Sequence, residues 1–91
     1  MPETKKYRNG TPVKVFLVLY TPYNITYVVT VPGELSEAER RRISKSVIDA
    51  ANQYYKTPIA MRRKLNIDHL KWMNTFVELA KFKNVLIEEA G

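Results

Sequence analysis

The 91-residue sequence contains no cysteine, only three glycines and a single histidine. Without cysteine, the chain forms neither disulfide bonds nor thiolate metal sites. Gly10, Gly33 and Gly91 are too scattered for a phosphate-binding loop, and no serine or threonine lies in a nucleophile motif. His69 has no second histidine with which to bind a metal, so we interpret it as a partly buried or capping residue. We therefore expect no cofactor, no metal and no enzymatic activity.

Long apolar segments are also missing. The longest run, Val15 to Tyr20, is well short of the roughly 20 residues that span a bilayer. Lys14 interrupts the apolar part that follows the basic start, and no small-residue cleavage site comes after it. These features predict a cytoplasmic protein that has no targeting segment and does not contact a membrane.

Positive charge is present in excess, and it is concentrated in one part of the chain. The net charge is +6. Residues 40–64 hold one acid, Asp49, against eight lysines and arginines, while the segments before and after are close to neutral. A local basic excess favours an anionic partner, either nucleic acid or an acidic protein surface.

Two strands are expected near the start, after a flexible basic arm at residues 1–12. The segments VKVFLVLY (13–20) and ITYVVTV (25–31) flank a tight connection, TPYN (21–24), and predict a β-hairpin. The first strand is apolar on both faces, with Phe16, Val18 and Tyr20 on one of them. Apolar residues on both faces are typical of a strand that is covered on both sides.

Three helices and a last strand are expected in the remainder of the chain. Ser36 to Glu39 form a capping box that predicts a helix over residues 37–55. Thr57-Pro58 ends that helix and starts a short one at 59–65; Asn66 or Asp68 caps a third at 68–83, and a strand follows at 85–89. We therefore predict one compact α+β domain at 13–91, with the order β-β-α-α-α-β and a three-stranded antiparallel sheet packed on helices.

The apolar surfaces need to be covered, and this need bears on whether the chain forms a dimer. Phe16, Val18 and Tyr20 cannot all face water, so a homodimer would supply the missing cover. The apolar arc of Trp72, Phe76 and Leu79 on the third helix is the candidate dimer interface. The alternative is that the monomer itself fills both surfaces.

Residues 58–89 resemble a winged helix-turn-helix in outline. A short helix ends at Leu65, a turn and a longer helix follow, and the strand at 85–87 stands where a wing begins. The family places a small residue where this chain has Arg62, and a recognition helix exposes a donor-rich face. The exposed face expected here is mixed, with Lys71, Asn74, Thr75, Glu78 and Lys81. We therefore favour core helices with a basic rim.

The function that follows is DNA or other nucleic-acid binding with weak sequence preference. The residues expected to contact phosphates are Arg62, Arg63, Lys64, Arg41 and Lys45. Tyr23, in the hairpin connection, is expected to stack on a base. The alternative is a protein-protein interaction module or inhibitor of the kind that small viral or plasmid genes encode. It would present the basic patch or the hairpin edge to an acidic partner.

Overall fold

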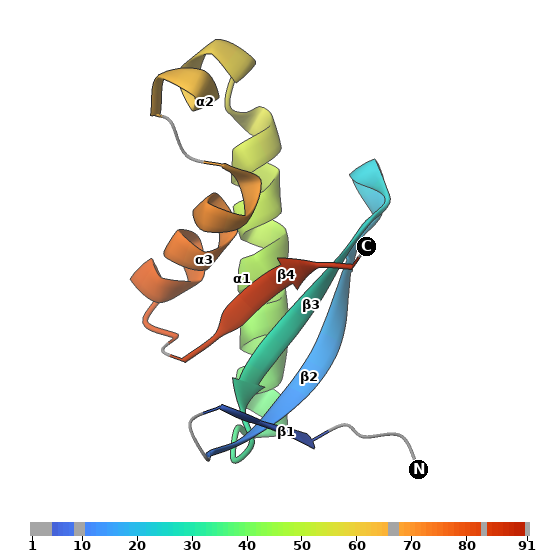
Figure 1. Cartoon of the computed structure of the whole chain (residues 1–91). Helices are drawn as coiled ribbons and strands as arrows, with labels where there is room; N and C mark the ends of the chain where they lie inside the picture. Colours follow the sequence, from blue (N-terminus) through green and yellow to red (C-terminus); the bar gives the residue numbers. More distant parts are fainter. Residues whose placement is uncertain (1–4, 9–10, 66–67, 83, 91) are drawn as a thin grey trace.

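The protein is an α+β domain in which helices cover one face of an antiparallel sheet (Figure 1). The computed structural model describes residues 5–8, 11–65, 68–82 and 84–90. The strands are β1 (Lys5–Arg8), β2 (Thr11–Tyr20), β3 (Ile25–Pro32) and β4 (Leu86–Glu89), in the sheet order β1-β2-β3-β4. The helices are α1 (Glu37–Lys56), α2 (Ile59–Leu65) and α3 (His69–Leu79). From β2 onward, the predicted order β-β-α-α-α-β is confirmed.

Strand β1 was not anticipated by the sequence analysis, which placed its residues in the flexible arm. It pairs antiparallel with the beginning of β2, from Lys5 opposite Lys14 to Arg8 opposite Thr11. The sheet therefore has a fourth strand in addition to the three expected. Residues 1–4 and 9–10 of the arm lie outside the described residues.

The hairpin of β2 and β3 turns through the predicted connection. Thr21–Tyr23 form a short 3-10 helix, η1, and Asn24 follows in the left-handed region with a φ of 54°. Asparagine tolerates this region better than most residues with a side chain. The resulting register places Phe16 opposite Val29 and Val18 opposite Tyr27.

The predicted capping box is present at the start of α1. Ser36 Oγ accepts from the Glu39 backbone N–H at 3.2 Å, and the Glu39 carboxylate accepts from the Ser36 N–H at 3.3 Å. The short α2 has the predicted bounds. Asp68 caps α3 by accepting from the Lys71 N–H at 2.8 Å, whereas Asn66 lies outside the described residues.

Helix α3 ends at Leu79, several residues before the predicted end at 83. Lys81 adopts a left-handed φ of 71°, and its N–H donates to the Glu78 carbonyl at 2.9 Å. The Phe82 N–H then donates to the Val77 carbonyl at 3.1 Å, which completes a Schellman motif. This turn directs Phe82 back against the core. Packing of that ring stabilises the chain more than one further turn of α3 would.

The face of β2 that the helices cover is the one we expected to need cover from a second subunit. Val18 and Tyr20 are only 4% and 5% exposed, and Phe16 packs against the core. The β2–β3 register places these residues on the same face as Tyr27 and Val29. The opposite face of β3 includes Thr26 and Thr30 and is therefore more polar. Helices cover the more apolar face, and Leu17 and Leu19 are left outside at 59% and 64% exposure.

Candidate functional site

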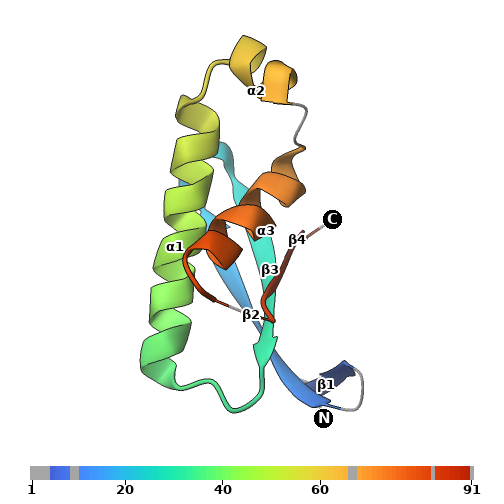
Figure 2. The same ribbon diagram turned by 90° about the vertical axis from the view of Figure 1, so that its left-hand side faces the viewer.

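The five basic residues predicted to contact phosphates lie in two groups. Arg41 and Lys45 lie on the outward side of α1, within its first three turns, and both are exposed. The triplet from Arg62 to Lys64 lies on α2, beyond the opposite end of α1 (Figures 1 and 2). Lys56 continues the outward side of α1, because it follows Lys45 by three helical turns. Arg41 and Lys56 are about 22 Å apart along the axis, at about 1.5 Å per residue.

Most of these cations have no ion-pair partner among the described residues. Arg41 lies 3.8 Å from the Glu37 carboxylate, which also pairs with Arg40. Within the described part of the chain, no carboxylate lies within ion-pair distance of the exposed side chains of Lys45, Lys56, Arg63 and Lys64. These four charges therefore remain available to a partner.

Arg62 is engaged within the protein. Its guanidinium lies over the Tyr54 ring, 4.5 Å from the centroid, and 5.7 Å from that of Tyr55. Its Nε donates to the Thr57 carbonyl at 3.0 Å. Arg62 thus connects α2 to the end of α1, and a phosphate would have to share a guanidinium that already has partners.

Tyr23 also has a partner within the chain. Its ring stacks on that of Tyr55 with centroids 3.9 Å apart and planes inclined by 14°. Tyr20 lies parallel to both rings at about 6 Å, and its hydroxyl donates to Asn52 Oδ1 at 2.8 Å. Tyr23 nevertheless remains 55% exposed. Tyr55 thus contacts both Tyr23 and Arg62, a relationship that the sequence pattern does not predict.

His69, which lies close to the Tyr54 and Tyr55 rings, contacts Tyr27 and Glu89 through its two ring nitrogens. The Tyr27 hydroxyl lies 2.6 Å from His69 Nε2, and Nδ1 lies 3.5 Å from a Glu89 carboxylate oxygen. Burial lowers the pKa of the His69 ring, and the Glu89 charge opposes that shift. Burial also raises the pKa of the Tyr27 hydroxyl. A neutral ring with its proton on Nδ1 lets Tyr27 donate to Nε2 and Nδ1–H point at Glu89.

Tyr27 and His69 are largely shielded from solvent, whereas the Glu89 side chain is 48% exposed. Tyr27 is fully buried, so its hydroxyl has no access to an external substrate. The His69 side chain is 18% exposed, in agreement with its interpretation as a partly buried residue. What the three groups can do is share protons among Tyr27 of β3, His69 of α3 and Glu89 of β4. In the described residues, no three His, Cys, Asp or Glu side chains are grouped to bind a metal ion.

Asn74 was expected on the exposed face of the third helix, but it contacts β4. Its Nδ2 donates to the Ile87 carbonyl at 3.0 Å, and its Oδ1 accepts from the Ile87 N–H at 2.8 Å. The weak signal for this role in the sequence was a poor helix-forming residue in the middle of α3. Since Asn74 is turned toward β4, it does not belong to the exposed face of α3.

Helix α2 is also unlike the first helix of a helix-turn-helix. None of its residues is buried, and it lies beyond the end of α1, whereas α3 packs beside α1 (Figure 2). Ile59, Met61 and Leu65 are 60%, 47% and 48% exposed. A short helix that is both basic and apolar therefore extends from one end of the molecule.

Of the predicted dimer interface, only Leu79 is strongly exposed, at 78%. Trp72 and Phe76 pack against the core, and Trp72 Nε1 donates to the Ala50 carbonyl at 3.1 Å. With Thr75, the three residues line a small apolar depression. This surface is narrower than the sequence pattern suggested, because the wide apolar arc of α3 is used to contact both α1 and the sheet.

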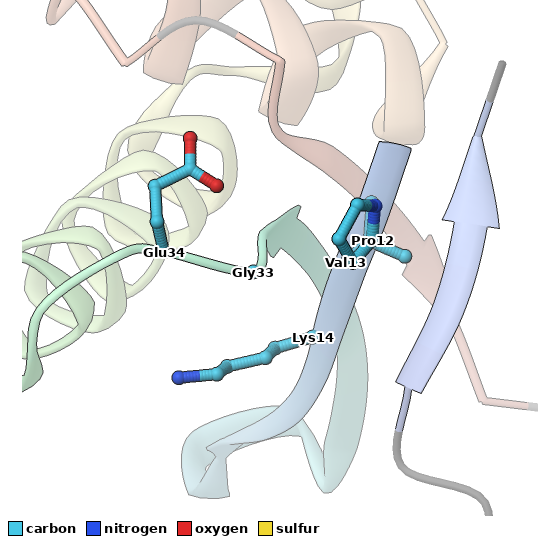
Figure 3. A pocket seen from close by; sticks show the side chains of 5 residues that line it. All are labelled: Pro12, Val13, Lys14, Gly33 and Glu34. Carbon is cyan, nitrogen blue, oxygen red and sulfur yellow. The ribbon is translucent and has the colours of Figure 1, made fainter. Parts of the chain in front are cut away.

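A second depression lies near β1, at the end of the molecule opposite α2 (Figure 1). It is lined by Pro12, Val13, Lys14, Gly33 and Glu34 (Figure 3). The Gly33 N–H donates to the Pro12 carbonyl at 3.0 Å, and a Cβ at Gly33 would lie 3.0 Å from that oxygen. In Figure 3 the Lys14 and Glu34 side chains extend apart, so they do not converge on a common point.

Comparison with known proteins gave no similarity to this chain: no family model, no curated protein and no solved structure matches it. Among the described helices, none is long and apolar enough to cross a membrane. The charges and surfaces described above are therefore the features that point to a function.

Proposed function

We propose that this protein binds nucleic acid, without a catalytic role, through the outward side of α1 and through α2, mainly by contacts to phosphates. The observation that carries the proposal is the set of four exposed cations, Lys45, Lys56, Arg63 and Lys64, with no carboxylate within ion-pair distance in the described residues. Each cation that reaches a phosphate releases a condensed counterion, and this release favours binding.

The arrangement of these cations favours contacts to the nucleic-acid backbone over the reading of bases. Lys45 and Lys56 lie about 16 Å apart along the outward side of α1, at about 1.5 Å per residue, and Arg63 and Lys64 follow on α2. Arg41 contributes less, because Glu37 already neutralises part of its charge. The exposed part of Tyr23 adds one surface on which an unpaired base can stack.

The test is fluorescence anisotropy with labelled single-stranded and duplex DNA over a salt series. We expect the affinity to fall steeply with salt. Arg63→Ala/Lys64→Ala and Lys45→Ala/Lys56→Ala should each reduce the slope of log affinity against log salt by about 2. The matched control is Lys14→Ala/Lys71→Ala, which removes the same charge from exposed positions elsewhere.

Two results would refute the proposal. One is the absence of binding to either DNA at low salt. The other is equal weakening by the control and by the site variants, because binding would then depend on total charge and not on this surface. Tyr23→Leu should weaken binding to single strands more than binding to duplex, since only an unpaired base can stack on the ring.

A second candidate is the capture of an acidic protein by α2. It is favoured by Ile59, Met61 and Leu65, which are exposed beside the basic triplet. Exposed apolar side chains rimmed by charge are typical of protein-docking surfaces. Ile59→Ser/Leu65→Ser would weaken this kind of binding while leaving the salt slope for DNA unchanged.

A further inference from the structure

We propose that Tyr23 and Tyr55 form an oxidative cross-linking site, at which a one-electron oxidant joins the two rings into a dityrosine that ties the β2–β3 connection to the end of α1. The inference does not depend on nucleic-acid binding. It rests on the stacking of these two rings, on their access to solvent and on the other side chains that compete for an oxidant.

The two rings are already in contact in the folded protein. Their centroids lie 3.9 Å apart and their planes are inclined by 14°, so carbon atoms of the Tyr23 ring lie within van der Waals distance of carbon atoms of the Tyr55 ring. Dityrosine forms through a bond between two ring carbons, each of which neighbours the carbon that carries the hydroxyl. In stacked rings, two such carbons meet after a small rotation of the side chains, with both backbone segments in place.

Among the tyrosines whose side chains the structure describes, no other pair is placed as well. Tyr20 lies parallel to the Tyr23 and Tyr55 rings, but its centroid is 6.0 and 5.9 Å from theirs, and its hydroxyl is engaged in a hydrogen bond. The Tyr54 ring is inclined by 87° to that of Tyr55. Tyr27 is fully buried. The geometry therefore identifies Tyr55 as the coupling partner of Tyr23.

An oxidant can reach this pair of rings. Tyr23 is 55% exposed, on the connection between two strands. The chain has no cysteine, so no thiol competes, and the side chains that lose a single electron most readily are the tyrosines and Trp72. The Trp72 ring contacts Tyr54, and Tyr54 contacts Tyr55, with centroid distances of 5.6 and 5.0 Å. Electrons pass readily between aromatic rings this close, so an indole that is oxidised first is reduced again by an electron from Tyr55.

The reaction balances when a haem peroxidase supplies the oxidant. The ferryl haem that forms from one hydrogen peroxide takes one electron from each phenol, and each phenol releases its proton. The two neutral phenoxyl radicals join through a carbon–carbon bond, and the hydrogens on the joined carbons move to the oxygens and restore both phenols. Overall, two tyrosines and one hydrogen peroxide give one dityrosine and two waters. The product is therefore lighter than the native protein by two hydrogen atoms.

The cross-link would fix the hairpin to the helix. It closes the chain from residue 23 to residue 55, a stretch that includes β3 and nearly all of α1. A covalent bond between residues this far apart restricts the unfolded chain more than the folded chain, as a disulfide does. The oxidised protein should therefore be the more stable form, with the Tyr23 ring held on Tyr55.

The first experiment treats the purified protein with a haem peroxidase and hydrogen peroxide in the absence of nucleic acid. Trypsin cuts after lysine and arginine, which leaves Tyr23 and Tyr55 in separate peptides, 15–40 and 46–56. We expect dityrosine fluorescence and a product with the mass of one chain less two hydrogen atoms. We also expect a cross-link between these two peptides, which fragmentation locates at Tyr23 and Tyr55.

Variants separate the stacked pair from the other tyrosines. Tyr23→Phe and Tyr55→Phe keep the aromatic ring but lack the phenol, so each should lose the product that joins the two peptides. Tyr54→Phe is the matched control, because it removes a neighbouring phenol and should retain that product. Circular dichroism checks that all three variants are folded. Oxidation of the wild type in urea, where the rings no longer stack, should give a mixture of tyrosine pairs.

The second experiment measures the melting temperature of the purified single-chain product, which should exceed that of the native protein by at least about 5 °C. The proposal is overturned if the folded protein joins other tyrosines as often as this pair, if the product persists in Tyr23→Phe, or if cross-links form only between two chains. A cross-linked protein that melts no higher than the native one would overturn it too, because the bond would then require a distortion of the fold.

Discussion

The side-chain amide of Asn74 forms two hydrogen bonds with the backbone of Ile87 at the outer edge of β4. The same Nδ2 group lies 2.9 Å from the Leu70 carbonyl, one turn earlier in α3. The Asn74 side chain thus fixes the position of α3 along β4. Both backbone groups of Ile87 therefore have hydrogen-bond partners without a further strand beside β4.

Replacement of Asn74 should therefore be costly. We expect Asn74→Ala to lower the free energy of unfolding by about 2 kcal/mol, because both backbone groups of Ile87 lose their partner in a part-buried site. Urea denaturation followed by circular dichroism measures the change. Gln53→Ala, on the exposed side of α1, is the control and should shift stability by less than about 0.5 kcal/mol. A change at Asn74 no larger than that of the control would contradict this role.

Arg62 should behave differently from the residue that follows it. Arg62→Ala removes the contact with the Tyr54 ring and the bond to the Thr57 carbonyl, at a cost of about 1 kcal/mol in stability. Arg63→Ala should leave stability unchanged and reduce only DNA affinity. Thermal unfolding of both variants, with Arg62→Lys as a partial replacement, measures the difference. Equal melting temperatures for all three would refute the structural role of Arg62.

Acid should destabilise the protein through His69. Burial lowers the pKa of this ring below its usual value of 6.5 in the folded state, so the unfolded chain binds the proton more readily. The stability contributed by the neutral ring is complete above pH 6.5 and is lost as the pH falls through the lower, folded-state pKa. Urea midpoints measured across this range should decline for the wild type. In His69→Gln the decline should be shallower, and an identical profile would exclude His69 as its source.

The capping box should contribute measurably to α1. Ser36→Ala removes the acceptor for the Glu39 N–H and should lower the free energy of unfolding by about 1 kcal/mol. Ser36→Asp should retain most of that stability, because a carboxylate caps equally well. Chemical denaturation of the two variants tests the assignment. Loss of the same stability in both would show that some other property of Ser36 matters.

Local patterns were sufficient to predict most of the elements. The bounds of α2 and the start of α1 follow from residues within one turn, such as Ser36, Glu39 and Pro58, so no distant contact is needed to define them. The Schellman turn at Lys81 was missed because lysine rarely adopts a left-handed φ. The contact between Phe82 and the core favours that conformation, and nothing adjacent in the chain announces it.

The sequence by itself determined the order of strands and helices and the concentration of positive charge in residues 40–64, because periodicity, capping and composition are local properties. Only the tertiary structure decided which face of β2 is covered, that Tyr23 stacks on Tyr55, and that Arg41 lies far from Arg63. It also decided that Asn74 bonds to the backbone of β4, while Leu17 stays exposed on the face that the helices do not cover. These relationships depend on strand register and on the direction in which each helix crosses the sheet, which residues distant in the sequence fix jointly through packing.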